Sequence, residues 1–221
     1  MAAWWICVLL FASLSETSLQ ENLRGYSLIF SRKGYVSLEV DQPRELLQNI
    51  TICLCSFSDS QSKQALFSYA TKDQDKEILI YKARGVDGFW WYTVYIGGTA
   101  EYFRVPDSYL DWQRICITWA SETGVLSLSM DRNLLARKVV QPGYFIKPHA
   151  LVQLGRAHHE DIFFHGEIHQ VHMWNYTVNI LLYPSEMPYL SSMISWNNMN
   201  YTTHGNVAVD YILSSPQSCP F

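Results

Sequence analysis

Charged residues are scarce in this chain. Asp, Glu, Lys and Arg make up 16% of its 221 residues, and they form no run of like charges. With a formal net charge of −4, the sequence lacks the electrostatic footprint of a nucleic-acid-binding protein. The hydrophobic share of 48% supports a sizeable core and argues against disorder.

Catalytic motifs are absent as well. The sequence contains no nucleophile elbow, no HExxH zinc motif, no P-loop and no dinucleotide-binding fingerprint. A glycoside hydrolase would need a pair of carboxylates. Glu77, Glu160 and Glu167 are available, but no spacing singles out an acid and a base. We therefore expect a protein that is not an enzyme, with a calcium-independent hydrolase as the weakest alternative.

Long hydrophobic segments are also missing, apart from one at the start of the chain. Residues 2–12 are all apolar, which is too short a run for a membrane-spanning helix. Small polar residues follow this run, so we expect a signal peptide over residues 1–19 and a single mature domain over residues 20–221. The alternative is a buried N-terminal strand or helix. The mature chain should be extracellular, with no transmembrane segment.

Cysteines are few, and none forms the CxxC spacing of a zinc site. Beyond Cys7, which lies in the expected signal peptide, four remain: Cys53, Cys55, Cys116 and Cys219. An even number in a secreted domain favours disulfides, and four cysteines allow three pairings. Cys53 and Cys55 would face the same side of a strand, so we do not expect them to bond to each other. Glycosylation sequons begin at Asn49, Asn175 and Asn200.

Short segments of alternating polarity dominate the chain. They are separated by turn residues, as at Gly97–Gly98, and this pattern indicates a β-sandwich or barrel. The segments are 35–40, 50–55, 77–81, 92–96, 115–119, 125–130 and 150–154. The best helix candidate is Ser185–Met199, which Pro188 interrupts. We predict an all-β fold with at most one short helix.

The segment from Arg114 to Ser121 closely resembles the signature of the pentraxins, His-x-Cys-x-Thr/Ser-Trp-x-Ser, with Arg114 in place of the histidine. Further matches cover most of the chain. They are Phe67–Lys72 with Asp75 and Glu77–Leu79, Gly143–Tyr144, Leu154–Gly155, Gly166–Ile168, Val171, Met173–Trp174, Trp196, Tyr201 and Gly205.

The resemblance implies a flattened jelly roll of two antiparallel sheets and a homo-oligomer, usually a pentamer. One face of a pentraxin binds calcium with a carbohydrate, phosphocholine or phosphoethanolamine ligand, and the other engages complement or receptor proteins. The resemblance also implies a disulfide between Cys53 and Cys116. Cys55 and Cys219 have no counterpart in the best-known members. They could pair with each other, link subunits or stay free as buried thiols.

The calcium ligands of the family are only partly present. Asp75 survives, but Lys76 replaces a ligand asparagine, and an ammonium group repels a dication. The loop after Gly155 is shortened, with Ala157 and His159 at two further ligand positions. Glu160 and Asp161 are the candidate substitutes, so a site would combine Asp75, Glu160 and Asp161. The resemblance implies calcium as the cofactor, but its ligands are largely missing here. We therefore expect the calcium site to be degraded, with a chain that binds no cofactor as the alternative.

Tyr81 and Tyr95 match two tyrosines of the family's ligand pocket. Between them lies the aromatic run Phe89–Tyr92, which could stack on sugars or hold a choline-like cation. The alternative is that Trp90 and Tyr92 face the core and leave Trp91 alone outside.

Five histidines crowd into a short segment: His158, His159, His165, His169 and His172. Imidazole suits zinc or copper. However, His169 and His172 are three apart on an expected strand and should face opposite sides. We favour scattered surface histidines over a metal site, with a pH-sensitive surface as a further alternative.

Together these features predict a secreted, pentraxin-like recognition protein of innate immunity. It would bind carbohydrate or phospholipid headgroups, and its calcium site would be degraded. The alternative is a structural or protein-interaction relative that has lost calcium-dependent ligand binding.

Overall fold

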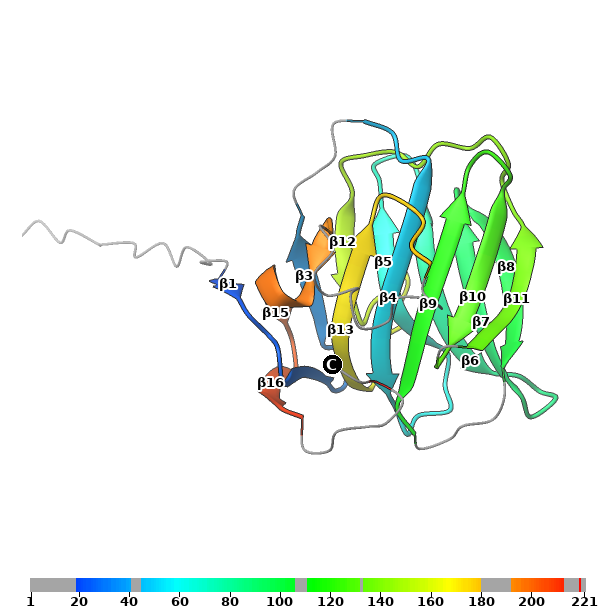
Figure 1. Ribbon diagram of the computed structural model, residues 1–221. Coiled ribbons are helices and arrows are strands. Elements are labelled where there is room, and N and C mark those ends of the chain that lie inside the picture. The colour runs from blue at the N-terminus through cyan, green and yellow to red at the C-terminus, as the bar shows by residue number, and fades with distance from the viewer. Residues whose placement is uncertain are drawn as a thin grey trace, which may run out of the picture.

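The computed structural model describes residues 19–40, 45–105, 111–131, 133–179, 192–212 and 219. In these ranges the chain forms two antiparallel sheets that lie face to face (Figure 1). Sheet A contains, in order, β1 (Leu19–Glu21), β15 (Met199–His204), β3 (Tyr35–Glu39), β12 (Leu151–Leu154), β5 (Gln64–Ala70), β6 (Ile78–Arg84), β7 (Trp90–Ile96) and β8 (Thr99–Val105). Sheet B contains β11 (Asn133–Val139), β10 (Val125–Met130), β9 (Gln113–Ala120), β4 (Asn49–Phe57), β13 (Gly166–Trp174), β2 (Tyr26–Phe30) and β16 (Val207–Tyr211), and β14 (Ile194–Ser195) pairs with β13.

The predicted all-β sandwich is confirmed, because alternating residues build one core between the sheets. In β7, Trp90, Tyr92 and Val94 are buried, while the residues between them are partly exposed. The Trp119 indole N–H, buried in this core, donates to the carbonyl of Val140 at 3.0 Å. The predicted strand 125–130 coincides with β10 at both ends.

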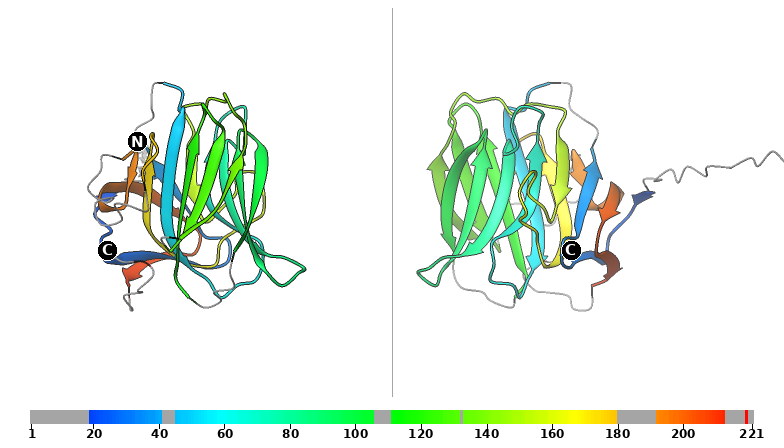
Figure 2. Two further views of the ribbon diagram at one scale, coloured as in Figure 1. Left: turned by 45° about the vertical axis from the view of Figure 1, so that its right-hand side comes forward. Right: turned by 180° about the vertical axis from the view of Figure 1, so that it is seen from behind.

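The turn predicted at Gly97–Gly98 joins β7 to β8. Both glycines have positive φ, 53° and 79°, as a tight hairpin turn requires. A Cβ atom on Gly97 would also lie 2.7 Å from the ring of Tyr144. The neighbouring β6–β7 hairpin projects beyond the end of the sandwich (Figure 2).

The helix predicted over Ser185–Met199 is wrong where it can be compared. Residues 185–191 lie outside the described residues. From residue 192 onward the chain forms β14, the 3₁₀ turn η2 (Trp196–Asn198) and the start of β15. The Trp196 indole N–H donates to the carbonyl of Leu23 at 2.7 Å, and the Leu23 N–H donates back to the carbonyl of Trp196. These tertiary hydrogen bonds replace the helical ones. Within the described ranges η2 is the only helical element.

The signal peptide predicted over residues 1–19 lies outside the described residues except for Leu19. That residue begins β1, which pairs with β15.

The expectation that His169 and His172 face opposite sides is also wrong. His169 pairs with Cys55 and His172 with Cys53 across the β4–β13 ladder, and the register shifts between the two histidines. Gln170, inside the shift, has a positive φ of 52°. This β-bulge inserts the extra residue that returns both imidazoles to the same face. That face is the outer side of sheet B, which also carries Cys53 and Cys55.

Candidate ligand-binding site

A loop after β12 covers the outer face of sheet A. Gly155 begins it with a φ of 79°, and a Cβ atom there would lie 2.7 Å from the ring of Phe30. Ala157, fully buried, packs in one cluster with Leu79 and Tyr81. The Ala157 N–H donates to the carbonyl of Ile162 at 3.2 Å, which closes the loop on itself. The loop therefore presents Glu160 to β6.

Glu160 is held by two donors, one from the turn before β6 and one from β6 itself. The Lys76 ammonium lies 2.5 Å from one carboxylate oxygen, and the Tyr81 hydroxyl donates to the other at 2.5 Å. Burial alone would raise the pKa of Glu160, but the hydrogen bonds from Lys76 and Tyr81 outweigh it and lower that pKa. The hydrogen bond to Glu160 in turn raises the pKa of Lys76. Both groups are therefore charged at neutral pH.

Cations also lie over the two tyrosine rings. The Lys63 ammonium is 4.0 Å from the ring centroid of Tyr81, and the Lys76 ammonium is 4.9 Å from that of Tyr95. The two rings meet edge to face, with centroids 6.0 Å apart. Tyr81 is buried and Lys63 is exposed, whereas Tyr95, Lys76 and Glu160 are partly exposed. We call Lys63, Lys76, Tyr81, Tyr95 and Glu160 the lysine–tyrosine cluster.

A buried carboxylate fixes the backbone beside Lys76. Glu77 is fully buried, and it accepts hydrogen bonds from the Tyr144 hydroxyl at 2.9 Å and the Lys147 N–H at 2.7 Å. Sequence reasoning missed this positioning role of Glu77. It also missed Lys63, because a single exposed lysine carries no sequence signal.

The proposed calcium ligands do not converge. Asp75 lies 3.5 Å from a ring nitrogen of His159, and Asp161 lies 2.8 Å from the ammonium of Lys33. Glu160 is already paired with Lys76. Calcium needs about six to eight oxygen ligands. At this edge of the described structure no three carboxylate, imidazole or thiol groups meet within 4.8 Å. The residues present here do not fit a calcium ion, because a lysine ammonium already lies against the carboxylate.

The aromatic run Phe89–Tyr92 divides between core and surface. Trp90 and Tyr92 are buried and face the core, and Trp91 is partly exposed. Trp91 is not alone outside, however, because Phe89 is 38% exposed, and the Arg104 guanidinium lies over its ring at 3.3 Å.

The histidines separate into groups on different sheets. A ring nitrogen of His158 lies 3.1 Å from the carbonyl of Leu151, and His159 pairs with Asp75, both beside sheet A. His169 and His172 belong to the outer face of sheet B. The candidate hydrolytic carboxylates are likewise dispersed, since Glu167 accepts a hydrogen bond from Ser27 at 2.7 Å.

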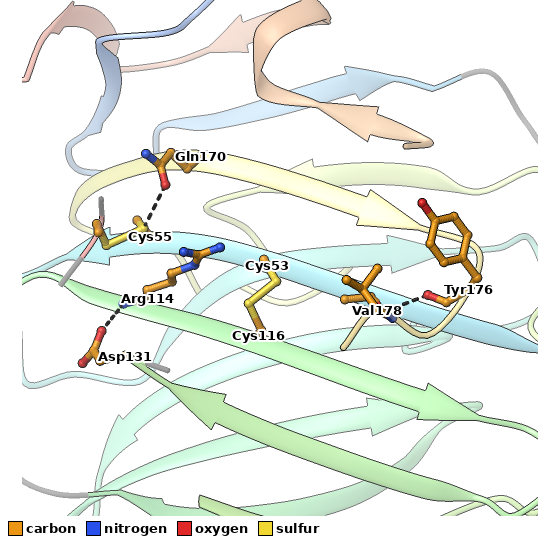
Figure 3. The surroundings of a disulfide bond; sticks show 10 residues. Cys53, Cys55, Arg114, Cys116, Asp131, Gln170, Tyr176 and Val178 are labelled. Carbon is orange, nitrogen blue, oxygen red and sulfur yellow. Dashed lines mark hydrogen bonds between the residues drawn. A yellow bond between two sulfur atoms is a disulfide. The ribbon is translucent and has the colours of Figure 1, made fainter. Parts of the chain in front are cut away.

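Two disulfides cross the outer face of sheet B. A disulfide joins Cys53 on β4 to Cys116, which lies directly opposite on β9 (Figure 3). Trp174 and Val178 pack in one buried cluster with it. Cys55 is joined to Cys219. A covalent link across such long stretches of chain typically adds about 4–5 kcal/mol in the loop-entropy account.

Of the three sequons, Asn175 is exposed, whereas Asn49 and Asn200 are partly buried within strands.

The fold is a two-sheet all-β sandwich, and the lysine–tyrosine cluster lies on the outer face of sheet A. A sequence model of the Pentaxin family matches residues 29–211, and the chain belongs to this family. Mucosal pentraxin from Bos taurus is 32% identical over 91% of this chain and 95% of its own length. Human serum amyloid P-component is 29% identical over 93% of this chain and 95% of its own length.

Among solved structures, the native heptameric SAP-like pentraxin from Limulus polyphemus matches with a TM-score of 0.77 at 15% identity. The match covers 90% of this chain and 99% of the Limulus chain. At this low sequence identity the similarity supports the fold alone. Pentraxins such as serum amyloid P-component and C-reactive protein are non-enzymatic binding proteins, in agreement with the missing catalytic motifs. No helix in the described part of the chain is long and apolar enough to cross a membrane.

Proposed function

We propose that this chain is a secreted pentraxin of innate immunity that recognises carbohydrate or phospholipid-headgroup ligands without calcium. The observation that supports this most is the Lys76–Glu160 ion pair in the lysine–tyrosine cluster. In a calcium-dependent pentraxin the metal supplies positive charge to the ligand. Here Lys76 already neutralises Glu160, and the exposed ammonium of Lys63 beside it supplies positive charge from the chain itself; lysine is a common phosphate binder. The partly exposed Tyr95 ring offers a face for a sugar or a choline-like cation.

The proposed secretion and assembly concern the whole chain. Residues 1–19 act as the signal peptide and residues 20–221 form the mature domain. The family assignment favours a homo-oligomer, with a pentamer as the form implied by resemblance.

Calorimetry tests the proposal directly. Calcium added to the purified protein should give no binding heat, and a chelator should leave the thermal unfolding midpoint unchanged. Arrays of glycans, phosphocholine and phosphoethanolamine should give the same signals in chelator as in calcium. Calcium binding with calcium-dependent stability would overturn the proposal.

Matched variants then locate the site. Tyr95→Ala should abolish the array signal. Tyr102→Ala removes an exposed tyrosine from the adjacent strand, β8, and should leave the signal intact. Equal effects of the two substitutions would place binding elsewhere.

The second candidate is a protein-interaction pentraxin without a small ligand. A hollow of about 360 Å³ on the outer face of sheet B favours it, lined in part by Ser127, Arg137 and Asn179. This function would join the chain to a complement or receptor protein. If this function is correct, the ligand arrays should give no signal. The chain should instead bind a protein partner, and Arg137→Glu should abolish that binding.

A further inference from the structure

The Cys55–Cys219 disulfide lies beside a histidine, buried at the outer face of sheet B. Cys55, Cys219 and His169 are all fully buried. Their sulfur atoms and a ring nitrogen lie within 4.8 Å of one another, and no other three His, Cys, Asp or Glu side chains in the described residues meet so closely. Trp112 covers the histidine, with ring centroids 4.4 Å apart. Phe57 packs against Trp112.

The bulge at Gln170 creates this juxtaposition. Without the bulge, a regular strand would place residues three apart on opposite faces and turn either His169 or His172 into the core. With it, His169 stands directly opposite Cys55, and the Gln170 side-chain oxygen lies 3.7 Å from the Cys55 sulfur (Figure 3).

Two sulfurs and an imidazole at this spacing form a ligand set suited to zinc. Tetrahedral zinc with bonds of about 2.3 Å to sulfur places two thiolates roughly 3.7 Å apart. Because the sulfurs of a disulfide are about 2 Å apart, reduction must let Cys55 and Cys219 separate by roughly 1.7 Å to hold the ion. In the oxidised chain the sulfurs are bonded to each other and cannot both act as thiolate ligands.

We infer that the chain with the Cys55–Cys219 disulfide reduced binds one zinc-type divalent cation through Cys55, Cys219 and His169. The Gln170 side-chain oxygen or a water molecule completes the fourth position. This inference is independent of the proposed recognition function, because the disulfide lies on sheet B and the lysine–tyrosine cluster on sheet A.

A thiol reductant opens the Cys55–Cys219 disulfide by exchange. Two thiol molecules give two electrons and two protons to the disulfide, yielding two cysteine thiols and one oxidised reductant disulfide. The cation then displaces both thiol protons into solvent as the thiolates coordinate it. His169 needs no deprotonation, since burial lowers the pKa of its imidazole to about 3.

Cobalt titration of the purified full chain tests the inference. The protein is reduced with a phosphine, which does not compete as a thiol ligand, and circular dichroism follows the fold. The reduced chain should bind cobalt with the thiolate charge-transfer and visible bands of a tetrahedral site, and native mass spectrometry should show one zinc per chain. The oxidised chain should bind neither ion.

The chain supplies its own control. His172 stands opposite Cys53 of the other disulfide, as His169 stands opposite Cys55. His169→Ala should weaken zinc binding at least about tenfold, whereas His172→Ala should leave it unchanged. Equal affinities of the wild-type chain and His169→Ala would overturn the inference.

Two further results would also overturn it. One is a reduced, folded chain that takes up no stoichiometric metal. The other is a reduced chain that unfolds and stays unfolded with zinc present, because a cation held by three folded-state ligands must favour folding.

Discussion

Acidification from about pH 7.5 to pH 5 should destabilise this protein through His169 and His172. Burial lowers the pKa of His169 to about 3 and that of His172 to about 4 from an ordinary value of 6.5. A histidine with a depressed folded-state pKa contributes its full stability above the unfolded pKa. That stability is lost as the pH falls from 6.5 toward the folded value, because only the unfolded chain takes up the proton.

The magnitude at pH 5 hardly depends on the exact folded pKa. At this pH the solution is about 1.5 pH units below the pKa of a histidine in the unfolded chain. Protonation then stabilises the unfolded chain by about 2 kcal/mol for each histidine. The pair should therefore cost about 4 kcal/mol, a large part of a typical total of about 5–15 kcal/mol. Burial also lowers the pKa of His158, so this residue adds a loss of the same sign.

Denaturant unfolding at the two pH values, with disulfides intact, measures the loss. The wild-type free energy of unfolding should fall by about 4 kcal/mol or more. His169→Gln and His172→Gln together should remove most of that fall, because glutamine does not titrate. His149→Asn replaces an exposed histidine and should leave the fall unchanged. A double variant that retains the whole pH dependence would refute the reasoning.

Three further predictions concern other sites. Gly97→Ala should destabilise the protein by about 1–3 kcal/mol in denaturant unfolding, since alanine disfavours the positive φ and meets the Tyr144 ring; a neutral effect would contradict the turn geometry. Tyr81→Phe leaves part of the Glu160 carboxylate without its donor and should cost about 1–2 kcal/mol at pH 7, whereas an unchanged unfolding midpoint would show that the hydrogen bond is unimportant. Asn175→Gln should remove a glycan seen by deglycosylation and gel shift, because Asn175 is the exposed sequon; an unchanged glycoform pattern would contradict this.

The sequence predicts the sandwich well because its strands are marked by local chemistry. Segment 125–130 alternates strictly and becomes β10 without adjustment, and the glycine pair at 97–98 gives the turn. The failed helix over Ser185–Met199 shows the limit of local patterns. There the Trp196 indole bonds with the carbonyl of Leu23, a residue far away in the chain, and no local propensity reports such a contact.

The sites were harder to predict, because they depend on how elements meet. Lys76 stood out in the sequence as a residue that calcium would not tolerate. Its partner, however, comes from a loop over sheet A, so the ion pair with Glu160 exists only in the folded chain. The bulge at Gln170 is harder still, since a non-glycine residue with positive φ leaves no mark in the sequence. That single insertion turns both His169 and His172 toward the outer face of sheet B. It thereby brings His169 opposite Cys55 and His172 opposite Cys53, a placement that the alternation of a regular strand does not predict for residues three apart.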